Sequence, residues 1–261
     1  MDQAPGADAL IDEVVDYLKS SRSVLVITGA GLSADSGLPT YRGRGGLYDA
    51  FPAGEGLTME QVLSAEGLNS DPARIWRHLG QVEHSCRGSR PNRGHAVIAA
   101  MEQEFERCWV LTQNIDGLHQ QAGSHNVISI HGNLHEVRCC ACDYQSRVRD
   151  YAELGTSPHC PSCGASLRPD VVLFGEHLNR KAVGLYEREI PEPFDMVFSI
   201  GTTSLFPYIR EPVLDAALFD RPTVEINPEE TEVSDVVTVR LPERAEACLE
   251  RIWQRYGGTL P

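Results

Sequence analysis

The chain has 261 residues, of which 41% are hydrophobic, 23% charged and 7% aromatic. This composition is typical of a globular protein and excludes a disordered, collagenous or low-complexity chain. The formal net charge of −14 repels nucleic-acid phosphates and anionic membrane surfaces, so we expect no direct nucleic-acid binding. The length predicts two domains, or one large domain that carries an insertion.

The sequence contains no candidate membrane span, because apolar runs such as 24–27 and 171–174 fall far short of the roughly 20 residues that a bilayer requires. The first ten residues include Asp2 and Asp8 but no basic residue, so the pattern of a secretory signal is absent. Eight cysteines are too few for a disulfide-rich scaffold. These features predict a cytoplasmic protein.

The hydrophobic pattern predicts alternating helices and buried strands. Leu10, Val14, Tyr17 and Leu18 recur at helical spacing, and a short β-branched run follows them at 24–27. Similar short runs lie at 108–111, 127–130, 196–200 and 223–226. Further helical stretches lie at 94–105, 213–219 and 242–256. This order predicts an α/β fold with a parallel, Rossmann-like sheet and helices on both faces.

Two regions interrupt this pattern. Residues 134–169 contain two close cysteine pairs and predict a small inserted metal-binding domain. Residues 39–56 are rich in glycine and predict either a mobile linker or a loop that closes on a ligand. The sheet domain is then assembled from residues 1–38, 57–133 and 170–261.

A glycine-rich turn at residues 29–34 follows the first predicted strand. Backbone amides in such a turn can approach a pyrophosphate at a helix start, although a plain tight turn also uses glycines. Ordinary dinucleotide-binding folds place an acidic residue about 20 positions further on, after a second strand. This chain has Tyr41 and Arg42 in that region instead, which disfavours an ordinary dehydrogenase, and Arg42 is a candidate phosphate ligand.

Polar side chains follow two other predicted strands. Asn114 and Asp116 come after the run at 108–111, and His131 comes after the run at 127–130. Open α/β sheets bind ligands at the carboxyl ends of their strands, so these side chains predict a site, although turn, cap or structural roles are the alternative. An imidazole suits general-base chemistry, and an amide with a carboxylate can hydrogen-bond a carboxamide.

Four cysteines have the spacing of a zinc site. Cys139 and Cys142 form one C-x2-C pair, and Cys160 and Cys163 form another after 17 intervening residues. Four thiolates fill a tetrahedral ion and leave no position for water, so we expect one structural Zn²⁺. A redox dithiol is the alternative, for which a single pair would suffice.

The assembled motifs resemble those of the sirtuins, which are NAD-dependent protein-lysine deacylases. The matching segments span most of the chain in family order: 29–33 with 36–42, 112–119, 131–132, the two cysteine pairs, 168–169 with 174–176, 201–204 and 225–227. The resemblance implies a nucleotide-binding domain, a small zinc domain, and a cleft between them that takes NAD and an acyl-lysine peptide.

The resemblance also implies roles for individual residues. His131 is the catalytic residue, which removes a proton from the ribose hydroxyls of NAD. The NAD-binding residues are Gly29, Ala30, Gly31, Ser33, Ala34, Thr40, Tyr41, Arg42, Gln113, Asn114, Ile115, Asp116, Gly201, Thr202, Thr203 and Asn227. The acyl-lysine protein or peptide is expected at His78, Leu79, Val172, Phe174, Gly175 and Glu176, with Gly175 and Glu176 pairing with its backbone.

One departure from the family pattern concerns the acyl group. The bacterial and mitochondrial branch that removes succinyl or malonyl groups uses a tyrosine and an arginine, three positions apart, to bind the acyl carboxylate. Aligned on Trp76, these positions are Leu79 and Val82 here. A carboxylate without a counter-charge in an apolar channel is unfavourable, so we predict a neutral acyl group. The alternative is that Arg74 or Arg77 replaces the missing arginine.

Three other functions fit parts of this pattern. The first is a protein mono-ADP-ribosyltransferase, and the second is an NAD-dependent desuccinylase or demalonylase. The third is a non-catalytic module that senses NAD or binds partners through its zinc domain, and it predicts binding without turnover. The presence of Asn114, Asp116 and His131 favours deacylation.

Overall fold

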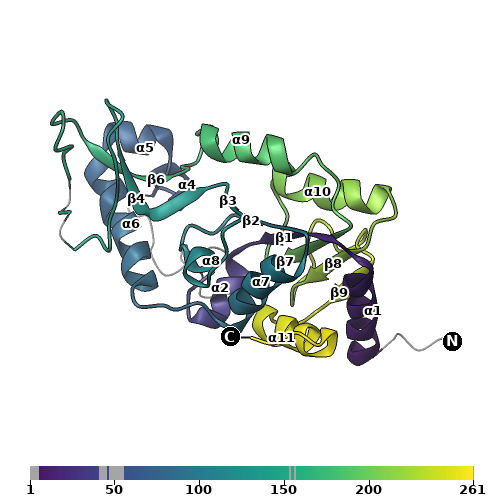
Figure 1. The fold of residues 1–261 in the computed structure, drawn as a ribbon. Helices are drawn as coiled ribbons and strands as arrows, with labels where there is room; N and C mark the ends of the chain where they lie inside the picture. Colours follow the sequence, from purple (N-terminus) through teal and green to yellow (C-terminus); the bar gives the residue numbers. More distant parts are fainter. Residues whose placement is uncertain (1–5, 41–45, 47–55, 153, 156, 261) are drawn as a thin grey trace.

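The computed structural model describes residues 6–40, 46, 56–152, 154–155 and 157–260. Its larger part is a six-stranded sheet, and its smaller part is a three-stranded sheet with its own helices (Figure 1). The predicted residues Tyr41 and Arg42, and most of the predicted loop 39–56, lie outside the described residues.

The six-stranded sheet has the strand order β3-β2-β1-β7-β8-β9 and is parallel throughout. Its strands are β1 (Ser23–Thr28), β2 (Arg107–Thr112), β3 (Val127–Ser129), β7 (Met196–Ile200), β8 (Thr223–Ile226) and β9 (Val239–Leu241). The five predicted strands are therefore confirmed. The edge strand β9 was missed because it has only three residues and pairs only with β8.

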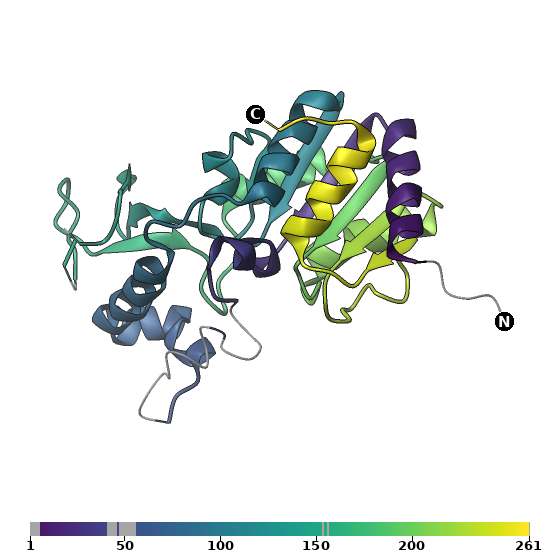
Figure 2. The same cartoon turned by 90° about the horizontal axis from the view of Figure 1, so that it is seen from below.

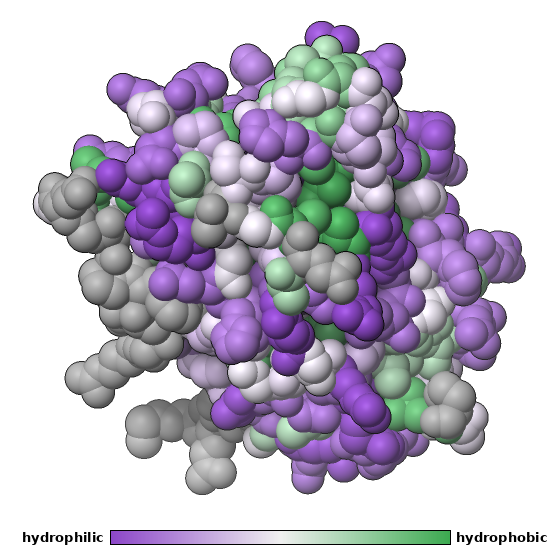
Figure 3. All heavy atoms as spheres, turned by 90° about the vertical axis from the view of Figure 1, so that its left-hand side faces the viewer, coloured by the Kyte–Doolittle hydropathy of each residue, from purple (hydrophilic) through white to green (hydrophobic). Residues whose placement is uncertain are grey.

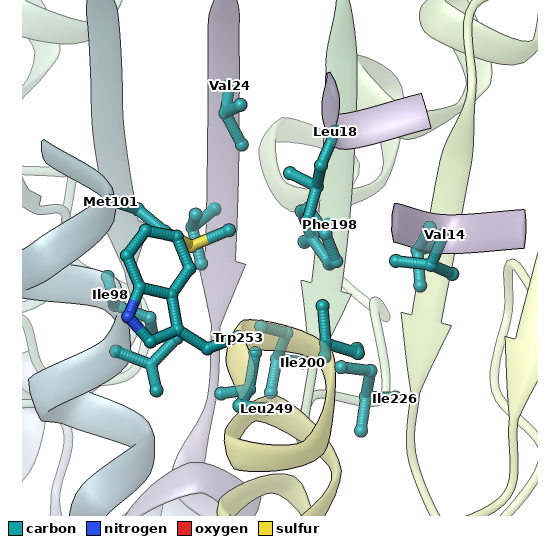
Figure 4. Close-up of a cluster of buried hydrophobic side chains, with 14 of the residues drawn as sticks. Val14, Leu18, Val24, Ile98, Met101, Phe198, Ile200, Ile226, Leu249 and Trp253 are labelled. Carbon is teal, nitrogen blue, oxygen red and sulfur yellow. The ribbon is translucent and has the colours of Figure 1, made fainter. Parts of the chain in front are cut away.

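One face of this sheet is covered by α1 (Ala7–Ser20), α7 (Arg93–Glu104) and α11 (Ala245–Tyr256). Figure 2 shows α11 between the other two helices. The side chains of Val24 and Val26 from β1, and Phe198 from β7, point into this layer and meet Leu249 and Trp253 of α11. Figure 4 shows several of these contacts, and they close the main hydrophobic core.

The opposite face is covered by α9 (Arg180–Glu189) and α10 (Pro207–Leu218). Leu25 and Ile27 alternate with Val24 and Val26 along β1 and point into this second layer. Alternation along a strand sends successive side chains to opposite faces, so an all-apolar strand is buried on both. The predicted α/β sheet with helices on both faces is thus confirmed. Helix α10 begins earlier than predicted, because Pro207 occupies its first turn.

The smaller part contains an antiparallel sheet with the order β5-β4-β6, and it lies beside the large sheet. Its strands are β4 (Gly132–Cys139), β5 (Gln145–Arg147) and β6 (Leu167–Val171). Three helices accompany it: α4 (Met59–Val62), α5 (Ala65–Ser70) and α6 (Pro72–Cys86). Figure 3 shows that hydrophilic residues cover most of the outer face on this side, with smaller hydrophobic areas among them.

The α4–α6 helices share an apolar core with the cysteine-bearing strands. Trp76 on α6 donates its indole proton to the Leu167 carbonyl at 3.0 Å, and its ring meets that of Tyr151 edge-on at 5.2 Å. The predicted division assigned residues 57–133 to the sheet domain, but this core groups residues 59–86 with the cysteine module. The sequence did not predict this packing, because the two segments are far apart in the chain.

Among the helices of the described ranges, none combines the length and the apolar character that crossing a membrane would require.

Candidate active site

The predicted site residues meet at one edge of the parallel sheet. Parallel strands all end at the same edge, so the segments after β1, β2, β3, β7 and β8 lie together there. These segments carry Gly29, Gln113, His131, Gly201 and Asn227, respectively. The sheet topology therefore assembles residues that are far apart in the chain.

The glycines of the first turn allow the segments after β1 and β7 to approach closely. A Cβ atom on Gly29 would lie 2.7 Å from the Gly201 carbonyl oxygen, and one on Gly31 would lie 2.6 Å from the Gly201 Cα. The amides of Gly29 and Gly31 donate to the carbonyls of Ile200 and Gly201 at 3.0 and 2.9 Å. Both amide protons are therefore already donated to backbone carbonyls that join the two segments. These hydrogen bonds do not support the prediction that the Gly29 and Gly31 amides face a pyrophosphate.

Asn114, Ser33 and Asp116 form a buried chain of hydrogen bonds. Asn114 Nδ2 donates to the Gly29 carbonyl at 3.0 Å and to Ser33 Oγ at 3.1 Å. Ser33 Oγ donates to Asp116 Oδ2 at 2.7 Å, and the amide of Leu118 donates to Asp116 Oδ1 at 2.9 Å. Burial raises the pKa of Asp116, although the Leu118 and Ser33 hydrogen bonds oppose this effect. The Leu118 hydrogen bond gives Asp116 the turn role that the sequence allows, and its predicted role in binding NAD stays a prediction.

A second set of polar contacts joins the ends of β2, β7 and β8. Gln113 Nε2 donates to Thr202 Oγ1 at 2.6 Å, and Asn227 Nδ2 donates to the Thr202 carbonyl at 3.0 Å. The amide of Ser204 also donates to Thr202 Oγ1, at 3.1 Å. Thr202 thus holds the two side chains that the resemblance assigns to ribose hydroxyls.

His131 is oriented by hydrogen bonds at both ring nitrogens. Its Nδ1 lies 3.2 Å from the Gln113 carbonyl oxygen, and its Nε2 lies 2.7 Å from the Tyr208 hydroxyl. A carbonyl oxygen only accepts, so Nδ1 carries the proton and Nε2 accepts the tyrosine proton. Burial lowers the pKa of His131 to about 4, while the Gln113 hydrogen bond opposes the shift. The ring is therefore neutral at pH 7, with a lone pair at Nε2.

Tyr208 is a site residue that the sequence analysis did not identify. It lies in the first turn of α10, which begins at Pro207 after the segment that follows β7, and its ring stacks on that of Phe206 at 5.4 Å. The edge of the His131 ring meets both aromatic rings, at 5.6 and 5.9 Å. The sequence signal that could have identified it is an aromatic residue directly after a proline, in the segment that follows the predicted strand at 196–200.

A layer of buried histidines supports the segment that carries Asn114. Thr28 Oγ1 donates its only proton to Thr112 Oγ1 at 2.8 Å. His119 Nε2, which lies 2.9 Å from Thr28 Oγ1, must therefore be the donor in that second hydrogen bond. Thr112 Oγ1 also accepts the Asn114 amide at 3.0 Å. The His95 ring meets His119 edge-on at 5.1 Å, and burial lowers the pKa of both. Both histidines are therefore neutral side chains that support the segment carrying Asn114.

The lowered pKa of His95, about 4, predicts that acid destabilises the protein. In the unfolded chain this histidine is protonated near pH 6.5. Its contribution to the free energy of unfolding is therefore complete above pH 6.5 and is lost as the pH falls towards 4. At pH 5 the loss is about 2 kcal/mol for this group. Urea unfolding at pH 7 and pH 5 measures it, and the difference should shrink in His95→Gln. An equal difference in both proteins would contradict this assignment.

The predicted peptide-binding segment at residues 172–176 is anchored on both sides. The Val172 amide donates to the His131 carbonyl at 2.9 Å, which ties this segment to the histidine. The amide of Phe174 donates to the Leu63 carbonyl at 2.8 Å, and its carbonyl accepts the amide of Ala65 at 3.1 Å. The backbone of Phe174 is therefore already paired along one edge.

Glu176 forms an ion pair with Arg168, whose side chain is only 4% exposed. Two guanidinium nitrogens of Arg168 donate to the two carboxylate oxygens at 2.5 and 2.8 Å, and the amide of Leu173 donates to one of them at 2.9 Å. Burial raises the pKa of Glu176, but these hydrogen bonds outweigh it, so the pKa is lowered overall. Glu176 thus fixes the turn that contains Gly175, whose φ is +77°.

The residues predicted to shape the acyl channel are buried on α6. His78 is 8% exposed and Leu79 3% exposed, and Leu79 and Val82 belong to the core of the smaller part. Arg77 is exposed, and Arg74 pairs with Asp71 at 3.2 Å. Arg77 lines a cavity of about 210 Å³, together with Trp76, Gly80, His84, Arg87, Tyr151, Ala152 and Gly155.

The other predicted NAD-binding residues are more dispersed. Ala30 begins the short helix α2 (Ala30–Ser33), and Ala34 begins the 3₁₀ turn that follows it. The Ile115 carbonyl accepts the Leu134 amide at 2.8 Å, which connects the site to β4. Thr40 is half-buried and Thr203 is exposed. None of these five positions carries a charged side chain.

The four predicted cysteines form one cluster. The Sγ atoms of Cys139, Cys142, Cys160 and Cys163 all lie within 4.8 Å of one another, and all four thiols are free. Four sulfurs at about 2.3 Å from a tetrahedral Zn²⁺ are separated by roughly 3.8 Å, so this quartet fits one structural zinc ion. The neighbouring Cys140 is exposed and lies outside the cluster.

Comparison with known proteins connects this site to a family. The Sir2 family model matches residues 29–206. A "NAD-dependent protein deacylase 2" from Pseudomonas aeruginosa is 45% identical over 238 residues, which cover 90% of this chain and 93% of that protein.

Two solved structures have a similar fold. A Sir2 homologue bound to NAD has a TM-score of 0.85 and 29% identity, with 94% of this chain and 93% of that chain covered. A complex of Sir2 with a p53 peptide and NAD+ has a TM-score of 0.79 and 29% identity, with 95% and 98% covered. From the matched family model and the 45% identity, this chain belongs to the Sir2 family.

Proposed function

We propose that this protein is an NAD-dependent protein deacylase, which consumes NAD and water to move an acyl group from lysine to ADP-ribose and releases nicotinamide and free lysine. The observation that carries the proposal is the orientation of His131, whose Nδ1 is fixed by the Gln113 carbonyl so that Nε2 is the proton acceptor. The relative from P. aeruginosa, named as a deacylase of this kind, supports it.

The strand ends offer a fitting set of groups for NAD. Asn114 and Asp116 would hydrogen-bond the nicotinamide carboxamide, since an amide and a carboxyl group match its donors and acceptors. Gln113 and Asn227, both held by Thr202, would contact the ribose hydroxyls. When bound, NAD supplies the ADP-ribosyl group that accepts the acyl group as nicotinamide leaves.

His131 would act as the general base. Burial keeps its pKa near 4, so the ring is neutral at pH 7 and Nε2 can accept a proton from a ribose hydroxyl. The Gln113 carbonyl then stabilises the protonated ring, because it continues to accept the Nδ1 proton. Removing the hydroxyl proton makes the ribose oxygen a stronger nucleophile.

An acyl-lysine peptide is the proposed partner, and the segment 172–176 is its proposed binding edge. Val172 ties this segment to His131, and Glu176 fixes the turn at Gly175. The peptide complex of a structurally similar Sir2 protein supports this partner class. A reducing, cytoplasmic compartment would keep the four clustered thiols available for zinc.

Labelled NAD and an acetyl-lysine peptide test the proposed activity. We expect nicotinamide, free lysine and soluble acyl-ADP-ribose to form in equal amounts. Label that stays on protein without lysine release would identify an ADP-ribosyltransferase instead. Binding of NAD without any turnover would identify a sensing module.

We also propose a neutral acyl substrate. At the positions where the acidic-acyl branch has a tyrosine and an arginine, Leu79 and Val82 are apolar and buried. The exposure of Arg77 and the ion pair between Arg74 and Asp71 support the absence of a counter-charge at these positions. An unpaired buried carboxylate costs several kcal/mol.

The predicted outcome is that kcat/KM for acetyl-lysine exceeds that for succinyl-lysine by about 100-fold or more, since about 1.4 kcal/mol corresponds to a factor of ten. The measurement is nicotinamide release from matched peptides that carry acetyl, longer aliphatic, aromatic or succinyl groups. Equal or faster use of the succinyl peptide would contradict the assignment. Arg74→Gln and Arg77→Gln would then show which guanidinium binds the carboxylate.

A further inference from the structure

We propose that the Tyr208 hydroxyl is the resting partner of the catalytic base, and that a ribose hydroxyl of the bound substrate must replace it before His131 can remove a proton. Tyr208 is thus a positioning residue that holds the ring ready and shields its lone pair. The inference rests on the proposed function, in which His131 is the base.

The geometry leaves no second acceptor on the imidazole. Nδ1 donates to the Gln113 carbonyl, so Nε2 carries the only lone pair in the ring plane, and the Tyr208 hydroxyl lies 2.7 Å from it. A lone pair that already accepts one hydrogen bond cannot accept a second one in the same direction. The ribose hydroxyl and the tyrosine hydroxyl therefore compete for one position.

The tyrosine is held in this position by its surroundings. Its ring stacks nearly parallel on Phe206, at an angle of 11°, and lies at the start of α10, where the backbone is helical. Tyr208 is half-buried, so its side chain borders solvent and can shift away from Nε2 when another donor takes the place of its hydroxyl. Substitution by phenylalanine keeps the stacked ring and removes only the hydroxyl.

The hydroxyl also affects the basicity of the ring. A donor at Nε2 stabilises the neutral imidazole and not the protonated one, so it lowers the pKa of His131. Of the described residues, Tyr208 is the titratable group in contact with His131, and no charged side chain contributes to the lowered pKa. Removing the hydroxyl should therefore raise this pKa.

The expected result for Tyr208→Phe has two parts. In the substrate-free protein, the pKa of His131, followed by NMR of its ring signals, should rise by about 0.5–1 pH unit. The KM for NAD should fall about 2- to 10-fold, because the ribose no longer displaces a hydrogen bond of ordinary strength.

The pH profiles distinguish exchange from a relay in which the tyrosine passes the proton. The acid limb of kcat/KM reports the free enzyme and should move to higher pH in Tyr208→Phe, whereas the acid limb of kcat reports the substrate complex and should not move. A relay would lower kcat by 100-fold or more in this variant and would overturn the proposal.

Tyr186→Phe is the matched control, because Tyr186 is a half-buried tyrosine on α9, outside the site. It should leave the pKa of His131 and the KM for NAD unchanged. An unchanged pKa of His131 in Tyr208→Phe would overturn the resting contact regardless of turnover. Full activity of His131→Ala would instead refute the proposed function, so the two failures are distinguishable.

Discussion

His131→Ala should lower kcat for deacylation by about 10²- to 10⁴-fold while the dissociation constant for NAD changes less than about threefold. The kinetic loss has the size of general-base catalysis, because Nε2 is the group that would remove the ribose proton. Binding should persist because Asn114, Asp116 and Gln113 retain their hydrogen bonds to Gly29, Ser33, Leu118 and Thr202, independently of the imidazole. Steady-state rates and calorimetric titration with NAD measure the two quantities separately.

His125→Ala is the matched control for this substitution. The His125 side chain is 86% exposed and lies away from the strand ends that form the site, so its loss should leave kcat within twofold. Normal turnover by His131→Ala would show that another group removes the proton. A large loss of NAD affinity in the same variant would show that His131 mainly binds the co-substrate.

Loss of the metal should unfold the smaller part of the molecule. A structural zinc ion contributes on the order of 10 kcal/mol to the folding of a small domain. Cys139 and Cys160 are buried within the same apolar core as Trp76. We expect Cys160→Ser, or chelation of the wild-type protein, to lower the melting temperature by roughly 10 °C or more, and to abolish binding of the acyl peptide.

Cys140→Ser provides the control at an adjacent position, because Cys140 is exposed and outside the sulfur cluster. This variant should keep one zinc ion per chain, as measured by elemental analysis, and an unchanged thermal transition. The assignment fails if chelated protein retains the transition of the untreated protein. It also fails if Cys140→Ser loses zinc while Cys160→Ser retains it.

The local sequence was sufficient for the elements that depend on short-range patterns. The run at 24–27 is apolar at every position, and the structure shows why, since Leu25 and Ile27 face one helical layer while Val24 and Val26 face the other. The two cysteine pairs likewise predict a metal site from the local sequence, because two cysteines separated by two residues can bind one ion. The strand ends identified Asn114, Asp116 and His131 by position alone.

The sequence did not predict contacts that depend on how distant segments pack. In the chain, helices α4–α6 come after β1 and the glycine-rich turn of the large sheet. In the structure, however, Trp76 of α6 donates a hydrogen bond to the Leu167 carbonyl and packs in the apolar core of the smaller part. The glycines of the first turn match a phosphate-binding pattern, but the amides of Gly29 and Gly31 are used by Ile200 and Gly201. A one-dimensional pattern identifies the residue types and cannot show which partner satisfies each donor.

By itself, the sequence determined the sheet with helices on both faces, the four cysteines of the sulfur cluster and the residues at the strand ends, because each follows from periodicity or spacing in the sequence. Only the tertiary structure decided the environment of those residues, including the Tyr208 hydroxyl at His131 and the ion pair between Arg168 and Glu176. Hydrogen bonds act over about 3 Å and require a defined direction. Only the three-dimensional packing of the strand ends brings residues separated by many positions within that range.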